Sequence, residues 1–468
     1  MSRSRLEVVR NSLYPALITA GLLLGVAYLA RDGIGPRPLL LAGAGAAALA
    51  LLARPWLAPF APALAAMMVR REYGTGTEVA LNTATLLAPA LAVVWLVRGI
   101  LGRDLRRSAT PADRPWVLFL LAMLLSLVIG RATWDPAVPQ PGNLLLVQLG
   151  QYAIFVVAAI AYWLPGLTLR DPRDLERLTW AVLYVGGTLG FLRLLPGISQ
   201  LVAPITTAVF GRPPFWVVMA GLAGGLLLFH PTLSPRRRLF LVAMIALSVY
   251  ETTFHGRLSI SEWAGVWIVL AMLVWLRFPR LRWPAATAIV VLVMVGLLFP
   301  VAFEFAGGQA RWDESGGSRL VLIGRVVGVA LRNPLTGLGP AAYRPYAGMQ
   351  PLPYLNALWF HPQISSHNNY VDLFAHGGLL ALGLFGWLAW RILQFGVALV
   401  RTTPAGFARA YANGIVAVWV SLLCIMLLAD WVLPFVYNIG FRGFQASIVA
   451  WLFVGGLAVL PRGEEPAP

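Results

Sequence analysis

The sequence has no lysine, a single cysteine and few charged residues, which make up 12% of its 468 residues. A soluble domain carries about twice that share of charge, so the scarcity excludes an ordinary soluble protein. The single cysteine, Cys424, cannot form a disulfide within the chain. Hydrophobic residues, by contrast, make up 59% of the chain, and the mean hydropathy is +0.75. These values indicate an integral membrane protein.

Continuous apolar stretches of about 20 residues recur along the chain, the length that a helix needs to cross roughly 30 Å of hydrocarbon. Helices are expected because backbone polar groups in lipid must be satisfied within the segment. We therefore predict an all-α polytopic membrane protein with 12–14 transmembrane helices and a best count of 14. The predicted spans are 12–30, 38–53, 55–69, 79–97, 115–130, 144–164, 178–195, 215–230, 239–254, 259–276, 284–305, 370–391, 411–429 and 439–460. Three prolines make 55–69 the weakest, because they favour a broken or re-entrant helix.

All 36 basic residues are arginines, and the formal net charge is +17. The arginines lie in short clusters between apolar runs, as charges that flank membrane helices do, so we predict no nucleic-acid partner. With the N-terminus inside the cell, these clusters follow the positive-inside rule and a long polar segment lies outside. The chain thus divides into a helix bundle at 1–305, an extracytoplasmic loop at 306–369 and C-terminal membrane helices at 370–468.

The predicted outer loop has two features. Residues 318–332 place apolar side chains at helical spacing between arginines, which predicts an amphipathic helix on the membrane surface. Residues 333–346 are interrupted by glycine and proline, which predicts turns. We expect Arg325, Arg332 and Arg344 to contact lipid headgroups rather than a substrate.

His367 is one of only five histidines, and it lies where the outer loop is predicted to re-enter the membrane. Histidine can take up a proton near neutral pH, so we predict that His367 is the general base for an acceptor hydroxyl. Asn368, Asn369 and Tyr370 follow directly, and we expect one of the asparagines to orient the ring or a sugar. The alternative is a surface histidine beside an Asn-rich helix cap.

Arginines near the outer helix ends are candidates for binding phosphate. Arg257 lies in a very short connection between two spans, and Arg319 opens the amphipathic helix. A guanidinium binds oxyanions through two hydrogen bonds and keeps its charge, so convergence near His367 would form a site for a pyrophosphate leaving group. Contact with lipid headgroups is the alternative. Further candidates for supporting roles are Arg131, Arg193, Arg212, Glu251, His255 and Glu262, although one carboxylate could simply neutralise Arg257.

The sequence contains neither a nucleotide-binding fingerprint nor a convincing metal-ligand pattern. Asp313 and Glu314 are adjacent in the outer loop, but they do not have metal-binding spacing. We therefore predict no cofactor and no metal. A transfer without either needs a donor that carries its own good leaving group, and a polyprenyl pyrophosphate sugar meets that requirement.

An ordered set of short motifs resembles the O-antigen ligase and O-antigen polymerase superfamily. The motifs are Gly256-Arg257-Leu258-Ser259, Ser318-Arg319, Pro334-Leu335-Thr336-Gly337-Leu338-Gly339, His367-Asn368-Asn369-Tyr370 and Gly377-Gly378-Leu379. Two positions depart from the family pattern: His376 stands where an acidic residue is common, and Gly256 stands where serine precedes the arginine. The motifs span about 130 residues, and the many-helix frame extends the resemblance over most of the remaining chain.

The resemblance implies a GT-C-like membrane glycosyltransferase that uses undecaprenyl-pyrophosphate-linked glycan at the outer face of the bacterial inner membrane. It further implies that His367 activates an acceptor hydroxyl and that Arg257 and Arg319 hold the pyrophosphate during an inverting displacement. A ligase would transfer the glycan to lipid A–core, and a polymerase would transfer it to another repeat unit. A transporter is a remote alternative, because it would place ionisable residues deep within its spans.

Overall fold

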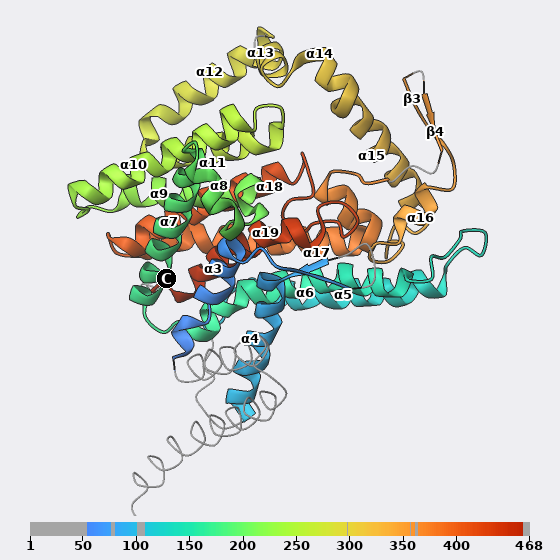
Figure 1. Cartoon of the computed structure of the whole chain (residues 1–468), viewed down its shortest axis with the longest axis horizontal. Helices are drawn as coiled ribbons and strands as arrows, with labels where there is room; N and C mark the ends of the chain where they lie inside the picture. Colours follow the sequence, from blue (N-terminus) through green and yellow to red (C-terminus); the bar gives the residue numbers. More distant parts are fainter. Residues whose placement is uncertain are drawn as a thin grey trace, which may run out of the picture.

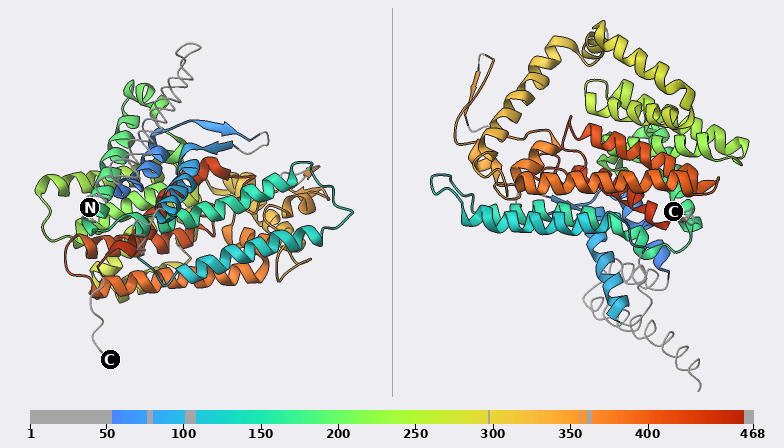
Figure 2. Two further views of the ribbon diagram at one scale, coloured as in Figure 1. Left: turned by 90° about the horizontal axis from the view of Figure 1, so that it is seen from below. Right: turned by 180° about the vertical axis from the view of Figure 1, so that it is seen from behind.

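The computed structural model describes residues 54–75, 80–100, 108–296, 298–355, 357–360 and 364–461. Helices dominate these residues, in agreement with the predicted class, and the only strands among them form two short hairpins. Figures 1 and 2 show the long helices lying side by side. The predicted spans 12–30 and 38–53 lie outside the described residues.

Six helices in the described part of the chain are long and apolar enough to cross a membrane. They are α5 (Asp113–Ala132), α6 (Leu144–Thr168), α11 (Ile260–Arg277), α17 (Asn369–Thr402), α18 (Phe407–Ile425) and α19 (Gly440–Gly455), the last continued by η8 (Gly456–Val459). Helices α4 (Thr83–Ile100), α7 (Pro172–Leu194), α9 (Pro213–Phe229) and α10 (Pro235–Val249) are shorter or more polar and coincide with further predicted spans. The protein is thus a multi-pass membrane protein, whereas the count of 14 stays a prediction.

The segment 55–69 has the broken form that its prolines predict. It consists of the 3-10 helix η2 (Pro55–Leu57) and the nine-residue α3 (Phe60–Met68). At 1.5 Å per residue α3 is only about 13.5 Å long, less than half of the hydrocarbon thickness. An antiparallel hairpin of β1 (Glu72–Gly74) and β2 (Ala80–Asn82) follows, with Glu72 opposite Asn82.

The centre of the bundle is α19, whose apolar window is 94% buried. It packs along α6, while α9 packs along α18 and α11. Glycine permits close approach of these helices, because a Cβ at Gly225 of α9 would lie 2.7 Å from the carbonyl oxygen of Ala410 on α18. The remaining short helices are α8 (Ile198–Val202), η3 (Ala203–Ile205), η4 (Ala208–Gly211), the π-helix η5 (Tyr250–His255) and η6 (Pro279–Leu281).

A chain of helices arches over one side of the bundle (Figure 1). It comprises α12 (Arg282–Met294), α13 (Leu298–Phe305), α14 (Gly308–Arg311), the π-helix η7 (Trp312–Gly316) and α15 (Gly317–Ala330). The predicted span 284–305 is therefore two helices, bent by 80° relative to each other, rather than one straight crossing.

Helix α15 confirms the helix predicted at 318–332. Its buried residues Ser318, Leu322, Val326 and Ala330 recur every four residues, so they form one stripe. The helix packs on α17 and on α16 (Tyr343–Ala347). A second antiparallel hairpin, β3 (Leu352–Tyr354) and β4 (Ala357–Trp359), follows, with Leu352 opposite Trp359. The stripe faces protein, whereas contact of α15 with a membrane surface stays a prediction.

Two of the glycine motifs meet in space and interlock. Gly378 breaks α17 with φ +63° and ψ −164°, and the turn 334–339 docks onto the break. Four backbone amides bond across it: Leu338 N to Ala375 O, Gly339 N to His376 O, Leu379 N to Pro334 O and Leu380 N to Leu335 O, at 2.8–3.1 Å. A Cβ at Gly378 would lie 2.3 Å from the Leu335 oxygen. The glycines therefore permit close backbone contact, and they fix the turn 334–339 against the break in α17.

Candidate functional site

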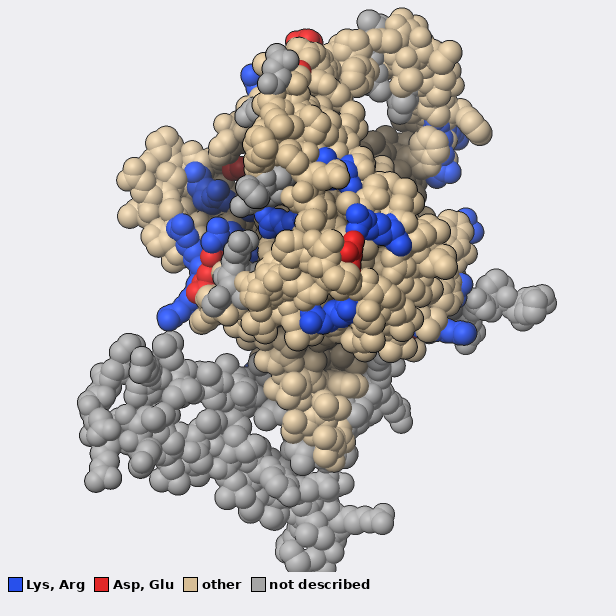
Figure 3. All heavy atoms as spheres, turned by 90° about the vertical axis from the view of Figure 1, so that its right-hand side faces the viewer, with Lys and Arg blue, Asp and Glu red and all other residues tan. Residues whose placement is uncertain are grey.

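Four connections meet at one end of the bundle, the end marked by α16 and the β3–β4 hairpin at the right of Figure 1. Asn369 N donates to Met426 O at 2.9 Å, which joins the start of α17 to the connection between α18 and α19. Arg319 Nη1 donates to Leu428 O at 3.0 Å, and Arg311 Nε donates to Leu258 O at 3.2 Å. Figure 3 faces this end, and arginines are more evident on it than carboxylates.

His367 lies directly before α17 in an unusual backbone conformation. Its φ of +51° falls in the left-handed region that side chains other than glycine and asparagine seldom adopt. The ring is half-buried, and Nδ1 lies 3.1 Å from Asn438 Nδ2. Burial and, secondly, the positive charge of Arg319 lower the pKa of His367 to about 4. The imidazole is therefore neutral at physiological pH, as a general base must be.

Asn438 connects His367 to a buried carboxylate. Asn438 Nδ2 donates to Asp430 Oδ1 at 2.6 Å, and the other oxygen of Asp430 accepts from Phe435 N at 2.8 Å. Asp430 is fully buried, and burial raises its pKa. A hydrogen-bonded row thus runs from His367 through Asn438 to Asp430. The carboxyl group of Asp430 favours its protonated form more than that of an exposed aspartate does.

The residues that follow His367 hold the backbone in place. Asn368 caps α17, because its Oδ1 accepts from Tyr370 N and Val371 N at 3.0 and 3.2 Å. Asn369 is fully buried and holds the connection between α18 and α19 through Val432 N and Leu433 O. The hydroxyl of Tyr370 donates to Leu423 O. The expected contact between an asparagine and the ring is made instead by Asn438, which sequence proximity could not identify.

A buried polar cluster anchors the turn that presents His367. Asp372 Oδ1 accepts from Ser366 Oγ at 2.7 Å and from Tyr343 Oη at 2.8 Å. Ser366 Oγ also accepts from Asn368 N at 3.0 Å. The cluster ties α16 to the first turn of α17, so the left-handed conformation at His367 is supported from both sides.

Arg319 lies at a small cavity of about 100 Å³, which Arg311, Trp312, Leu258 and Leu428 also line. Burial lowers the pKa of Arg319, and the nearby positive charge of Arg311 lowers it further, while Asp430 opposes both. Two guanidinium groups that repel each other beside a cavity favour an anion between them. Arg311 was not predicted, because its sequence context lacks a motif.

The short connection that carries Arg257 reaches the cavity at Arg319. The Arg257 side chain is exposed, and its neighbour Leu258 both lines the cavity at Arg319 and accepts from Arg311. Trp263 Nε1 donates to the carbonyl oxygen of Arg257 at 3.2 Å, which fixes the short connection. Arg319 thus lines the cavity, Arg257 directly precedes two of its lining residues, and the joint role of the two arginines stays a prediction.

The supporting candidates divide into two groups. Glu251 is buried and lies 3.3 Å from Nδ1 of the exposed His255, so the carboxylate pairs with this histidine. Arg212 packs 5.3 Å from the centre of the Trp431 ring and lines a cavity of about 280 Å³ together with Asn438. Burial lowers the pKa of Arg212, and the carboxylate of Glu262 opposes that shift. Arg212 therefore reaches the surroundings of His367 through Asn438, whereas its supporting role stays a prediction.

Two arginines for which lipid headgroups were expected, Arg325 and Arg332, have partners within the protein. Arg325 Nη1 and Nη2 donate to the carbonyl oxygens of Gln350 and Pro351 at 3.1 and 3.0 Å, and Arg332 pairs with Asp135 at 2.8 Å. Both arginines thus bind protein groups where lipid headgroups were expected, because α15 packs over the bundle. Arg344 packs 4.4 Å from the Tyr437 ring.

His376, which stands where the family pattern has an acidic residue, is buried among aromatic rings. Its ring stacks on Tyr343 at 5.4 Å between centroids and also contacts Phe155 and Phe435. Neither ring nitrogen has a hydrogen-bond partner in the described part of the protein. His376 therefore lies in packed, apolar surroundings, and the role of His367 as the general base stays a prediction.

The comparison with protein families bears on this end of the bundle. Residues 252–386 match the O-antigen ligase family. The predicted resemblance to the O-antigen ligase and polymerase superfamily is thereby confirmed, and the match supports a membrane enzyme of the glycosyltransferase type. The O-antigen ligase region includes Arg257, Arg319 and His367, whereas Asp430 and Asn438 lie beyond it. No curated protein matches the chain.

Metal binding has little support within the described ranges, where no group of three or more His, Cys, Asp or Glu could hold an ion. Metal independence nevertheless stays a prediction. Asp430 and Asn438 were missed because they lie 63 and 71 residues beyond His367 in a mostly apolar segment. Of these two residues, only Asp430 could have been identified from the sequence, since a lone carboxylate within a mostly apolar segment is a functional candidate by default.

Proposed function

We propose that the protein transfers a glycan from undecaprenyl pyrophosphate to an acceptor hydroxyl, in the manner of an O-antigen ligase with lipid A–core as acceptor. The observation that carries the proposal is the placement of a neutral His367 within electrostatic reach of Arg319, inside the region that matches the O-antigen ligase family. A base and an anion-binding group are the two functions that such a transfer requires from the protein.

In the proposed reaction, His367 Nε2 removes the proton of the acceptor hydroxyl while its oxygen attacks the anomeric carbon. The bond from that carbon to the pyrophosphate oxygen breaks, and undecaprenyl pyrophosphate leaves with the electron pair. Arg257 and Arg319 bind the pyrophosphate, with Arg311 beside them. A single displacement inverts the configuration. The reaction takes place at the outer face of the inner membrane, where the predicted topology places the loop 306–369.

Donor binding would also strengthen the base. The positive charge of Arg319 contributes to the low pKa of His367. A bound pyrophosphate neutralises that charge, so the pKa of His367 rises towards the ordinary value of a histidine when the donor is present. The base is thus weak without the donor and becomes competent once the leaving group is in place.

The Asn438–Asp430 pair would set the tautomer of His367. When Asn438 Nδ2 donates to Nδ1, the neutral ring carries its proton on Nε2 and cannot act there as a base. Rotation of the amide lets its oxygen accept from Nδ1–H, which frees Nε2. The amide oxygen of Asn438 then faces Asp430 Oδ1. This arrangement is favourable when Asp430 is protonated and can donate a hydrogen bond, and the raised pKa of Asp430 favours the protonated form.

The alternative function is a polymerase that joins repeat units, because the same base and leaving-group site serves any acceptor hydroxyl. Purified protein supplied with lipid-linked glycan distinguishes the two. Transfer that requires added lipid A–core supports the ligase. Chain growth without core supports the polymerase, and the absence of transfer under both conditions contradicts the proposed enzyme class.

A further inference from the structure

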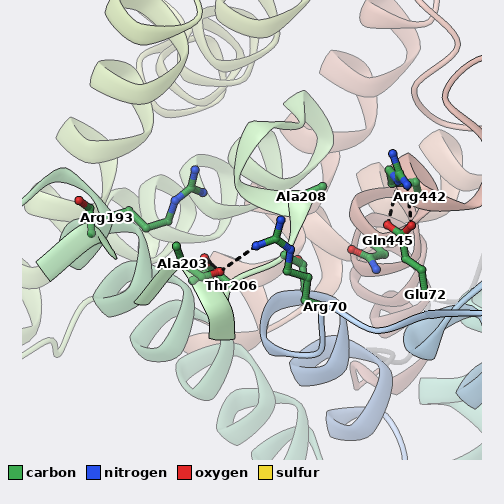
Figure 4. A pocket seen from close by; sticks show the side chains of 10 residues that line it. Arg70, Glu72, Arg193, Ala203, Thr206, Ala208, Arg442 and Gln445 are labelled. Atoms are coloured by element: carbon green, nitrogen blue, oxygen red, sulfur yellow. Dashed lines mark hydrogen bonds and ion pairs between the residues drawn. The ribbon is translucent and has the colours of Figure 1, made fainter. Parts of the chain in front are cut away.

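A cavity of about 720 Å³ lies apart from the arginines of the proposed pyrophosphate site. Its lining comes from the residue Arg70 after α3, strand β1, the last turn of α7, the segment between α7 and α9, and α19 (Figure 4). The charged residues among this lining are Arg70, Glu72, Arg193 and Arg442. Three arginines against one glutamate leave two formal positive charges. The volume lies within the range of about 300–1,000 Å³ for small-molecule sites.

The charges of this cavity are only partly satisfied within the protein. Arg442 is paired with Glu72 through two hydrogen bonds of 2.8 and 2.6 Å. Among the described residues, Arg70 reaches only the carbonyl oxygen of Ala203, at 3.5 Å. Arg193 lies over the Phe210 ring at 4.9 Å, and its buried Nη1 has no hydrogen-bond partner among the described residues.

A buried amide gives an independent indication of a ligand. Gln445 is 97% buried, lines the cavity from α19, and its Oε1 has no hydrogen-bond partner in the described ranges. A buried amide oxygen without a partner is costly, and a ligand hydroxyl would satisfy it. Hydroxyls of Ser199 and Thr206 line the same cavity. The arginines can bind an oxyanion, and the amide and the hydroxyls can bind the hydroxyls of a sugar. Together these groups match an acidic saccharide.

The cavity is connected to the catalytic end through one residue. Arg442 lines both this cavity and the smaller cavity formed by Arg212 and Asn438, and Asn438 contacts His367. A chain of sugars could thus extend from the reacting hydroxyl or anomeric carbon past Arg442.

We propose that the cavity lined by Arg70, Arg193, Arg442 and Gln445 is a subsite for an acidic sugar residue, bearing a carboxylate or phosphate, of the glycan that the enzyme transfers or extends. This rests on the proposed function for the identity of the glycan. The chemistry of the subsite is independent of it, because the subsite contains none of the residues assigned to the transfer step.

The test is a binding measurement on the full chain in phosphatidylcholine nanodiscs. The probes are fluorescently labelled trigalacturonate, which is acidic, and maltotriose, which is neutral. We expect the wild type to prefer trigalacturonate. Arg70→Gln and Arg193→Gln should each weaken its binding about tenfold, the effect of one hydrogen bond to a charged group. The exposed Arg70 provides a substitution that is compatible with folding.

The matched control is Arg238→Gln, which removes an exposed arginine of α10 without touching the cavity. It should leave binding unchanged. His367→Ala should also retain binding while transfer is lost, which separates this proposal from the proposed function. Equal binding of both probes, or equal losses in Arg70→Gln and Arg238→Gln, overturns the subsite. Displacement of trigalacturonate by phosphatidylglycerol in the nanodisc assigns the cavity to lipid headgroups and also overturns it.

Discussion

The two halves of the candidate site are built differently. The His367 half is fixed, since a helix cap, a buried Ser366–Asp372–Tyr343 cluster and the Asn438–Asp430 pair hold it in place. The arginine half is open, since Arg257 is exposed and Arg319 and Arg311 line a cavity.

The difference follows from what each half must do. A base must meet one hydroxyl in one geometry, because misplacement by about 1 Å can cost 100-fold in rate. Groups that bind a charged leaving group act over a longer range, and a paired carboxylate would cancel their charge. Each prediction below tests one half of this comparison.

The largest effect is expected for the base itself. His367→Ala should lower kcat/KM for glycan transfer by about 10²–10⁴-fold, the usual contribution of a general base. The variant should still insert and fold, because the ring is only half-buried. His230→Ala, at the end of α9, is the matched control and should transfer normally. Near-normal transfer by purified His367→Ala would eliminate the general-base role.

On the open half, Arg319→Ala should lower kcat/KM by about 10²–10³-fold, as the loss of one donor to a developing charge does. Arg319→Lys should recover only part of this loss, because lysine keeps the charge without the planar fork. Steady-state kinetics over a range of donor concentrations measure both variants, and Arg238→Gln controls for charge alone. Full activity of Arg319→Lys argues against bidentate binding of phosphate.

The fixed half depends on the break in α17. Gly378→Ala should destabilise the protein by about 1–3 kcal/mol from backbone strain alone, with a further cost from the close approach to Leu335. Gly383→Ala, in the same helix with no atom within 4 Å of the added Cβ, is the control. Thermal unfolding in detergent, with transfer assays alongside, compares the two. Equal midpoints would show that the interlocked turn does not hold the helix.

Substitutions of Asp430, which contacts His367 through Asn438, test whether its carboxyl group is protonated or ionised. Asp430→Ala should lower kcat/KM about tenfold, the equivalent of one hydrogen bond of about 1.4 kcal/mol. Asp430→Asn should stay within a few-fold of wild type, because its amide can donate to Asn438 as a protonated carboxyl would. A loss approaching 10⁴-fold in Asp430→Asn, as when an ionised aspartate orients a catalytic histidine, would refute the protonated form.

The smallest effect concerns pH. Because the pKa of free His367 is lowered to about 4, the ring stays neutral as the pH falls from 7 and gains a proton only near pH 4. The acid limb of kcat/KM should therefore lie near pH 4 rather than 6.5. Arg319→Gln removes one cause of the shift, so NMR titration of His367 in that variant should give a higher pKa. An acid limb at 6.5 would contradict the buried, arginine-facing environment.

Several elements could be predicted from particular residues. The spans around α5, α6, α11 and α18 followed from apolar length, and α15 followed from its helical spacing. The bend between α12 and α13 could not be predicted, because an apolar run does not reveal where a helix turns. The contacts of Arg325 and Arg332 with protein groups depend on the packing of α15 over the bundle. Their positions in the sequence do not reveal this packing and suggested contact with lipid headgroups.

The sequence by itself determined the membrane class and the family resemblance, and it predicted the three site residues Arg257, Arg319 and His367, because these depend on apolar run length and on short local motifs. The tertiary structure decided the partners of those residues. Asn438 reaches His367, Asp430 lies behind it, and Arg311 lies beside Arg319 only because distant connections meet at one end of the bundle. Contacts between segments far apart in the chain depend on helix packing, which local patterns do not encode.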